Sequence, residues 1–198
     1  MANPDSSPTD RRAFLSTAAE ATEALASALG AALGPGCVLA LAGDLGAGKT
    51  TFVRGLARGL GVRERVHSPT FTLMHVYEGR LPVYHFDAWM EGRERAFLAE
   101  GGAEELGGDG VAVVEWAARV SEWLPQPHLE VRLGHRGLEE RSVELALVGD
   151  ASAPPGPVLR AALAGLGASE GVRELSAQEL EMGVNPPSPG ALEGQDRL

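Results

Sequence analysis

The chain has 198 residues, 44% of them hydrophobic, which suffices for one domain with a core and at most a tail. Its formal net charge of −10 argues against a protein that grips nucleic acid by itself, because that mode of binding needs clustered cations. The single cysteine, Cys37, excludes an internal disulfide and is typical of a reducing compartment, so we expect a cytoplasmic protein.

The N-terminal part of the chain predicts a flexible end followed by a strand and a helix. Residues 1–10 are polar and contain proline, and residues 12–15 are predicted as a short strand. Residues 16–33 are predicted as an amphipathic helix, because leucines recur at four-residue spacing beside alanines. Thr17 and Glu20 have the spacing of a capping box, which predicts the start of this helix.

Arg11 and Arg12 resemble part of a twin-arginine export signal. Glu20 and Glu23 interrupt the apolar core that such a signal needs, so the helix is the better interpretation. No run approaches the ~20 apolar residues of a membrane span, and we expect no membrane partner.

The most specific motif follows an apolar run at residues 37–42, which predicts a buried strand. The motif fits Gly-x-x-x-x-Gly-Lys-Thr at every fixed position and reads Gly43-Asp44-Leu45-Gly46-Ala47-Gly48-Lys49-Thr50, followed by Thr51. Among the 17 lysine and arginine residues only Lys49 is lysine, and a P-loop needs a compact ammonium where a planar guanidinium would collide with the loop. Residues 50–60 are predicted as a helix that ends at Gly61.

This strand, loop and helix predict a nucleotide site. The backbone N–H groups of residues 46–50 are expected to face phosphate oxygens, and the Thr50 hydroxyl is expected to ligate Mg²⁺. The alternative is a glycine turn that happens to precede a helix. Guanine-specific P-loop proteins use an Asn/Thr-Lys-x-Asp element, and because Lys49 is the only lysine the sequence favours adenine.

Beyond the P-loop, residues 71–77 and 81–86 are predicted as strands of a hairpin with a turn at residues 78–80. The preceding segment carries hydroxyls at Ser68 and Thr70 on either side of Pro69. Such a segment can fold over a γ-phosphate, with Thr70 reporting its presence, or it can be a plain proline turn.

The second half of the chain alternates helical and strand patterns. Helices are predicted at residues 94–103, 117–124 and 158–166, and strands at residues 111–114, 129–133 and 141–148. The fold class is therefore α/β, a P-loop NTPase-like three-layer fold with a mixed parallel and antiparallel sheet. The composition shifts at Gly149, so we expect the domain to span residues 11–168 and a mostly disordered tail to span residues 169–198.

Two acidic residues follow predicted strands. Glu115 ends the run at 111–114, where α/β sheets place the acid that holds a Mg²⁺-bound water or orients the attacking water; the alternative is an exposed strand-end glutamate. Asp87 ends the second hairpin strand and is either a second, outer-shell carboxylate or an N-cap. The histidines 67, 75 and 85 lack zinc-ligand spacing, and Trp116 is expected to be a packing residue.

The ordered set of motifs resembles the TsaE family of small bacterial P-loop ATPases over about residues 14–166. The resemblance rests on Thr22, residues 43–52, Ser68-Pro69-Thr70-Phe71, His85-Phe86-Asp87 and Glu115-Trp116. It implies slow, Mg²⁺-dependent ATP hydrolysis with the TsaB and TsaD partners, in support of threonylcarbamoyl transfer to the adenosine beside the anticodon of tRNA. The tRNA would then be reached only through the complex.

The resemblance also implies roles for single residues. Lys49 and Thr50 match the phosphate and Mg²⁺ ligands, Thr70 the switch segment, and Asp87 and Glu115 the acidic residues of the site. One departure is Ala88-Trp89-Met90 where the family usually has Leu-Tyr-Arg, and the nearest arginines that can replace the missing one are Arg93 and Arg95.

Two other functions are compatible with the same phosphate-binding loop. A small-molecule kinase would use Arg93 and Arg95 as lid arginines. A nucleotide-gated binding module would bind its partner under the control of the nucleotide, and hydrolysis would be incidental to that function.

Overall fold

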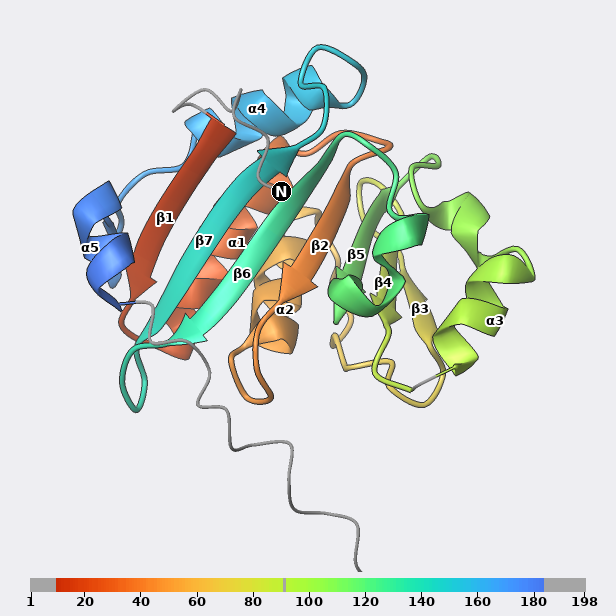
Figure 1. The fold of residues 1–198 in the computed structure, drawn as a ribbon, viewed down its shortest axis with the longest axis horizontal. Coiled ribbons are helices and arrows are strands. Elements are labelled where there is room, and N and C mark those ends of the chain that lie inside the picture. The colour runs from red at the N-terminus through yellow and green to blue at the C-terminus, as the bar shows by residue number, and fades with distance from the viewer. Residues whose placement is uncertain (1–9, 91, 184–198) are drawn as a thin grey trace, which may run out of the picture.

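The computed structural model describes residues 10–90 and 92–183, and its centre is one eight-stranded sheet (Figure 1). The strands are β1 (Arg11–Ser16), β2 (Val38–Ala42), β3 (Met74–Tyr77), β4 (Val83–Asp87), β5 (Val111–Glu115), β6 (His128–His135), β7 (Arg141–Val148) and β8 (Val172–Glu174). The helices are α1 (Ala19–Ala32), α2 (Lys49–Gly59), α3 (Arg93–Ala99), α4 (Gly156–Ala164) and α5 (Ala177–Gly183), with the 3₁₀ helices η2 (Gly102–Glu105) and η3 (Ala117–Trp123). No helix in the described ranges is long and apolar enough to cross a membrane.

The sheet has a parallel centre and antiparallel flanks, in the order β3-β4-β5-β2-β6-β7-β1-β8. β4, β5, β2 and β6 run parallel, whereas β3 on one side and β7, β1 and β8 on the other pair antiparallel. This arrangement confirms the predicted α/β fold with a mixed sheet. Because parallel strands end at the same edge, the loops after β2, β4 and β5 meet there.

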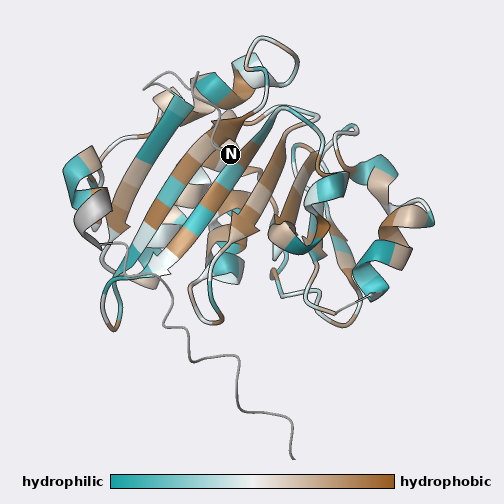
Figure 2. Ribbon diagram, viewed as in Figure 1, coloured by the Kyte–Doolittle hydropathy of each residue, from teal (hydrophilic) through white to brown (hydrophobic). Residues whose placement is uncertain are grey.

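Alternate residues of the central strands enter two separate cores. Leu39 and Leu41 of β2 pack with α1, α2 and α4 on one face, and Val38 and Ala40 pack with α3 and η3 on the other. Figure 2 shows the resulting brown, hydrophobic colouring of β2 and β5, which helices cover on both faces. Strands that are buried on both faces have nearly continuous apolar sequences, and for this reason they could be predicted from the sequence.

The structure changes the bounds or the type of several predicted elements. β3 begins at Met74, because the N–H groups of Thr72 and Leu73 bond to the carbonyl of Pro69 and turn the chain first. The helix predicted at residues 94–103 is divided into α3 and η2 by Gly101, whose φ is 124°. The segment after β5 is the 3₁₀ helix η3 with a kink at Val120.

The predicted capping box at Thr17 and Glu20 is wrong. α1 has Ala18 at its N-cap, with no side-chain cap. Thr17 instead bonds to the carbonyl of Gly171 through both its N–H, at 2.9 Å, and its hydroxyl, at 3.2 Å. The Thr17 hydroxyl, which the capping-box pattern assigned to the start of α1, is therefore bonded to the C-terminal segment instead.

Both predicted chain ends need correction. Asp10, which precedes β1, is buried and accepts from Arg160 of α4 at 2.8 Å, so it is not part of a flexible end; residues 1–9 lie outside the described residues. The tail predicted from residue 169 is structured up to residue 183, because β8 pairs with β1 and α5 follows, whereas residues 184–198 lie outside the description.

The start of α5 is a capping box that sequence reasoning missed. The Glu179 carboxylate accepts from the N–H and the hydroxyl of Ser176 at 2.9 and 2.8 Å, and Arg173 donates to it at 2.7 Å. These donors, the Ser176 N–H foremost, lower the pKa of Glu179 to about 2. The Ser-x-x-Glu pattern was present in the sequence, where the prediction of a disordered tail concealed it.

Helices α1 and α2 approach each other so closely that glycine is required in the contact. A side chain at Gly55 would collide with the backbone of Glu23. Gly55→Ala is therefore expected to lower the free energy of unfolding by about 2 kcal/mol, because overpacking against backbone outweighs the roughly 1 kcal/mol gain in helix propensity. Chemical denaturation measures the loss. Gly167→Ala, which meets nothing within 4 Å, is the control, and equal stability of both variants would contradict the prediction.

Candidate functional site

The candidate site lies where β2, β4 and β5 end side by side. Glu115, the last residue of β5, is paired in register with Leu41 of β2 and with Asp87 of β4. The loop that leaves β2 runs straight into α2, whose first residue is Lys49. The parallel pairing thus brings the P-loop and both predicted acidic residues to one edge of the sheet.

The conformation of the loop requires glycine, as two of its positions illustrate. Gly48 is the N-cap of α2 and has a φ of 101°, and Gly43 has a φ of 145°, where a side chain would also collide with the carbonyl of Leu133. The first turn of α2 has no side-chain cap, so its N–H groups remain available to an anion at the positive end of the helix.

Lys49 is buried, and neutral groups hold its ammonium. Nζ donates to the carbonyls of Gly43 and Asp44 at 2.8 and 3.0 Å and lies 3.5 Å from the centroid of the Trp116 ring. Burial lowers the pKa of Lys49, and the carboxylates of Glu115, Asp87 and Asp44 oppose this effect. In the described residues no acidic side chain forms an ion pair with Lys49, so a charge held without a direct counter-charge faces the pocket.

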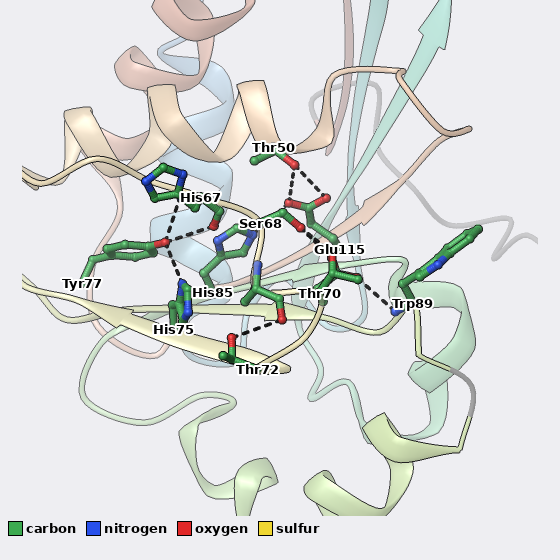
Figure 3. Close-up of polar contacts among 12 residues, drawn as sticks. Thr50, His67, Ser68, Thr70, Thr72, His75, Tyr77, His85, Trp89 and Glu115 are labelled. Carbon is green, nitrogen blue, oxygen red and sulfur yellow. Dashed lines mark hydrogen bonds and ion pairs between the residues drawn. The ribbon is translucent and has the colours of Figure 1, made fainter.

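Thr50 and Glu115 are in direct contact (Figure 3). The Thr50 hydroxyl lies 3.0 Å from Oε1 and 3.3 Å from Oε2 of Glu115, and His85 Nε2 lies 2.9 Å from Oε1. Glu115 is 3% exposed, which excludes the alternative of an exposed strand-end glutamate.

Asp87 holds the segment that was predicted as a switch. Its Oδ2 accepts from the Ser68 hydroxyl at 2.8 Å and from the Thr70 hydroxyl at 2.6 Å, and its Oδ1 accepts from the N–H of Trp89 at 3.0 Å. Because α3 begins only at Arg93 with Gly92 as N-cap, Asp87 is not the N-cap of a helix. Its carboxylate links the 68–70 segment to the end of β4.

Tyr77 of β3 fixes the other end of the same segment (Figure 3). Its hydroxyl accepts from the N–H of His67 and donates to the carbonyl of His67, both at 3.1 Å, and lies 3.2 Å from Nδ1 of His75. Burial raises the pKa of Tyr77. The hairpin thereby anchors the backbone just before Ser68 and leaves the hydroxyls of Ser68 and Thr70 at the pocket.

These groups surround a pocket of about 520 Å³. It is lined by the P-loop, by the 68–70 segment, by the two strand-end carboxylates and by two tryptophans. The lining residues are Leu45, Gly46, Gly48, Lys49, Thr50, Thr51, Ser68, Thr70, Asp87, Trp89, Glu115 and Trp116. Trp89 packs on Trp116 with ring centroids 4.5 Å apart, and Arg119 lies over Trp89 at 5.2 Å. Trp116 therefore does more than fill a core, because its ring lies against the Lys49 ammonium.

Not every residue singled out in the sequence reaches the pocket. Arg95 pairs with Glu122 at 3.2 Å and contacts the carbonyl of Arg119, and neither Arg93 nor Arg95 lines the pocket. The guanidinium of Arg119 contacts the altered Ala88-Trp89-Met90 segment, because it donates to the carbonyl of Trp89 at 3.1 Å. Across residues 10–90 and 92–183 no group of three His, Cys, Asp or Glu side chains is placed to hold a metal ion.

The fold and the pocket together define the class: an α/β protein with a P-loop-like fold whose site is built at the ends of its parallel strands. The family model described as threonylcarbamoyl adenosine biosynthesis protein TsaE matches residues 16–143. The chain belongs to the TsaE family, which has a role in the biosynthesis of threonylcarbamoyladenosine in tRNA.

Individual relatives agree with this assignment. The tRNA threonylcarbamoyladenosine biosynthesis protein TsaE of Bacillus subtilis (strain 168) is 45% identical over 132 residues, which cover 66% of this chain and 82% of the relative. The protein of the same name from Treponema pallidum is 43% identical over 119 residues, 60% of this chain and 88% of the relative. A crystal structure of YdiB from Bacillus subtilis matches with a TM-score of 0.63 and 37% identity, covering 77% of this chain and 93% of that one.

Proposed function

We propose that the pocket binds ATP with Mg²⁺ and that the chain hydrolyses the ATP slowly, together with TsaB and TsaD, in support of threonylcarbamoyl transfer to tRNA. The observation that carries this proposal is the environment of Lys49. A buried ammonium held by two carbonyls and an indole is costly without a counter-charge, and a triphosphate supplies one. The uncapped first turn of α2 supports the same ligand.

The oxygen atoms around Thr50 suit Mg²⁺. The ion prefers oxygen ligands and usually takes one or two carboxylates together with phosphates and water. Here the Thr50 hydroxyl and the Glu115 carboxylate are in contact, and Asp87 is the neighbour of Glu115 across the sheet. Thr50 would hold the ion, with Glu115 and Asp87 acting directly or through water. When bound, Mg²⁺ neutralises charge on the phosphates.

The residues of the chain divide the remaining work. Lys49 binds the β- and γ-phosphates, and Glu115 orients the attacking water or accepts its proton. Thr70 and Ser68 now donate to Asp87, and a γ-phosphate within reach would compete for these hydroxyls. Exchange of these bonds would let the 68–70 segment report the state of the nucleotide to a partner protein.

The rival function of a small-molecule kinase has less support. It depended on Arg93 and Arg95 as lid arginines, and Arg95 is engaged by η3 while neither residue lines the pocket. Transfer to water therefore remains the preferred reaction.

Calorimetry with ATP, ADP and GTP in the presence of Mg²⁺ tests the binding, and phosphate release with and without TsaB and TsaD tests the reaction. We expect adenine nucleotides to bind in preference to GTP, and free phosphate to form faster when both partners are present. A protein without affinity for adenine nucleotides would contradict the proposal. So would transfer of phosphate to a small-molecule acceptor in preference to water.

A further inference from the structure

His85 has a position that none of the roles above explains. Its side chain is fully buried in β4, its Nε2 lies 2.9 Å from Oε1 of Glu115, and in the described structure its Nδ1 has no hydrogen-bond partner. Figure 3 shows the imidazole directed at the Glu115 carboxylate from the neighbouring strand. A buried polar atom without a partner needs an explanation.

The register of the sheet puts His85 beneath the acidic pair. Asp87 is paired with Glu115, and His85, two residues earlier in β4, is paired with Val113. Side chains two residues apart point to the same face of a sheet, so His85 lies on the α2 face with Asp87 and Glu115. The Tyr77 ring, 6.3 Å away between centroids, closes the space behind the imidazole.

The two ring nitrogens have unequal surroundings. A carboxylate only accepts hydrogen bonds, so the hydrogen between His85 and Glu115 is carried by Nε2. A hydrogen on Nδ1 would be a buried donor without an acceptor, which costs more than a bare nitrogen with an unused lone pair. The surroundings therefore select the tautomer with its hydrogen on Nε2.

This hydrogen bond distinguishes the two oxygens of Glu115. Oε1 accepts from Nε2 of His85 and from the Thr50 hydroxyl, which is closer to Oε1 than to Oε2. The only described contact of Oε2 is with the Thr50 hydroxyl, at 3.3 Å. A carboxylate held by one oxygen keeps the other oriented. Oε2 is then the oxygen that faces a water or an ion in the pocket.

We infer that His85 is a positioning residue, whose Nε2–H fixes the Glu115 carboxylate in the orientation that hydrolysis needs. The expected effect on turnover rests on the proposed ATPase function. The hydrogen bond between His85 and Glu115 is independent of that proposal. Outer-shell partners that orient metal ligands typically change metal affinity or activity by about 10–100-fold when they are mutated, and we expect an effect of the same size for the donor that orients Glu115.

Three substitutions separate the hydrogen bond from packing. The amide nitrogen of glutamine reaches the place of Nε2, whereas that of asparagine reaches only the place of Nδ1. We expect His85→Gln to keep kcat within about threefold, and His85→Asn and His85→Leu to lower kcat by about 10–100-fold with little change in the Kd for ATP. Thermal unfolding identifies any variant that fails to fold, and the Gln and Asn pair is matched in chemistry.

A second measurement needs no nucleotide. In the full chain labelled with ¹⁵N-histidine, the His85 signals, assigned by their loss in His85→Gln, should show the tautomer with hydrogen on Nε2. A hydrogen on Nδ1 would overturn the inference, as would wild-type turnover in His85→Leu or an equal loss in His85→Gln and His85→Asn. If the wild-type protein neither binds nor hydrolyses ATP, the proposed function fails, and the tautomer still decides the His85–Glu115 bond.

Discussion

Replacing Lys49 with alanine is expected to weaken ATP binding by about 100-fold or more. Lys49 is the one cation among the residues that line the pocket in the described structure. Two charge-assisted contacts to phosphate oxygens are worth about 1.5–3 kcal/mol each, and 1.4 kcal/mol corresponds to a factor of ten. Isothermal titration calorimetry with Mg²⁺ and ATP measures the change.

Lys49→Arg is expected to lose binding as well, although it keeps the positive charge. The ammonium fits between the Gly43 and Asp44 carbonyls, at 2.8 and 3.0 Å, and the Trp116 ring at 3.5 Å. A planar guanidinium is too large for that space and would displace the loop. The comparison therefore separates the shape of the cation from its charge.

Arg132→Ala is the matched control, because it removes one positive charge from an exposed position of β6 outside the pocket. It should bind ATP as the wild type does. ATP binding by Lys49→Ala with unchanged affinity would remove the basis of the proposed nucleotide site.

The P-loop and the strand-end acids were accessible to sequence reasoning because their signals are local. The lone lysine, the glycine spacing and the apolar run before them all lie within about fifteen residues. Glu115 was found because a buried parallel strand reads as a continuous apolar run and the acid directly follows it. Such patterns depend on neighbours in the chain and on nothing distant.

From the sequence, His85 was considered as a metal ligand and as part of the family resemblance, but not as a partner of Glu115, although a signal for that contact was available. Alternation along β4 and β5 puts residues 85 and 115 on one face once the strands are known to be neighbours. The sequence alone does not show that β4 and β5 are neighbours, and His85 and Glu115 are 30 residues apart in the chain. The unequal surroundings of the two ring nitrogens follow only from the packed structure.

The C-terminal elements were missed for a different physical reason. β8 spans only Val172–Glu174, too short for a periodic pattern, and the strand it pairs with, β1, begins at Arg11. The same long-range pairing brings Gly171 to Thr17, which removes the hydroxyl from the predicted capping box. Local propensity yields to tertiary contact at both positions.

Glu115→Gln is expected to separate binding from turnover. The substitution keeps the size of the side chain and removes the negative charge, so the amide cannot act as a base. We expect the Kd for ATP to stay within about tenfold of the wild type, because the loss of one negative charge near the triphosphate offsets the loss of a carboxylate that helps to hold Mg²⁺. Hydrolysis should fall by about 100-fold or more, the usual contribution of a positioned general base. Single-turnover phosphate release and calorimetry measure the two effects on the same preparation.

The same variant decides between an ATPase and a nucleotide-gated binding module. If hydrolysis is required, Glu115→Gln with TsaB and TsaD should retain partner binding and lose tRNA modification. Full modification by a variant that binds ATP without hydrolysing it would favour the binding module, because occupancy alone would then suffice. Glu139→Gln, in an exposed turn outside the pocket, controls for the loss of one negative charge and should behave as the wild type.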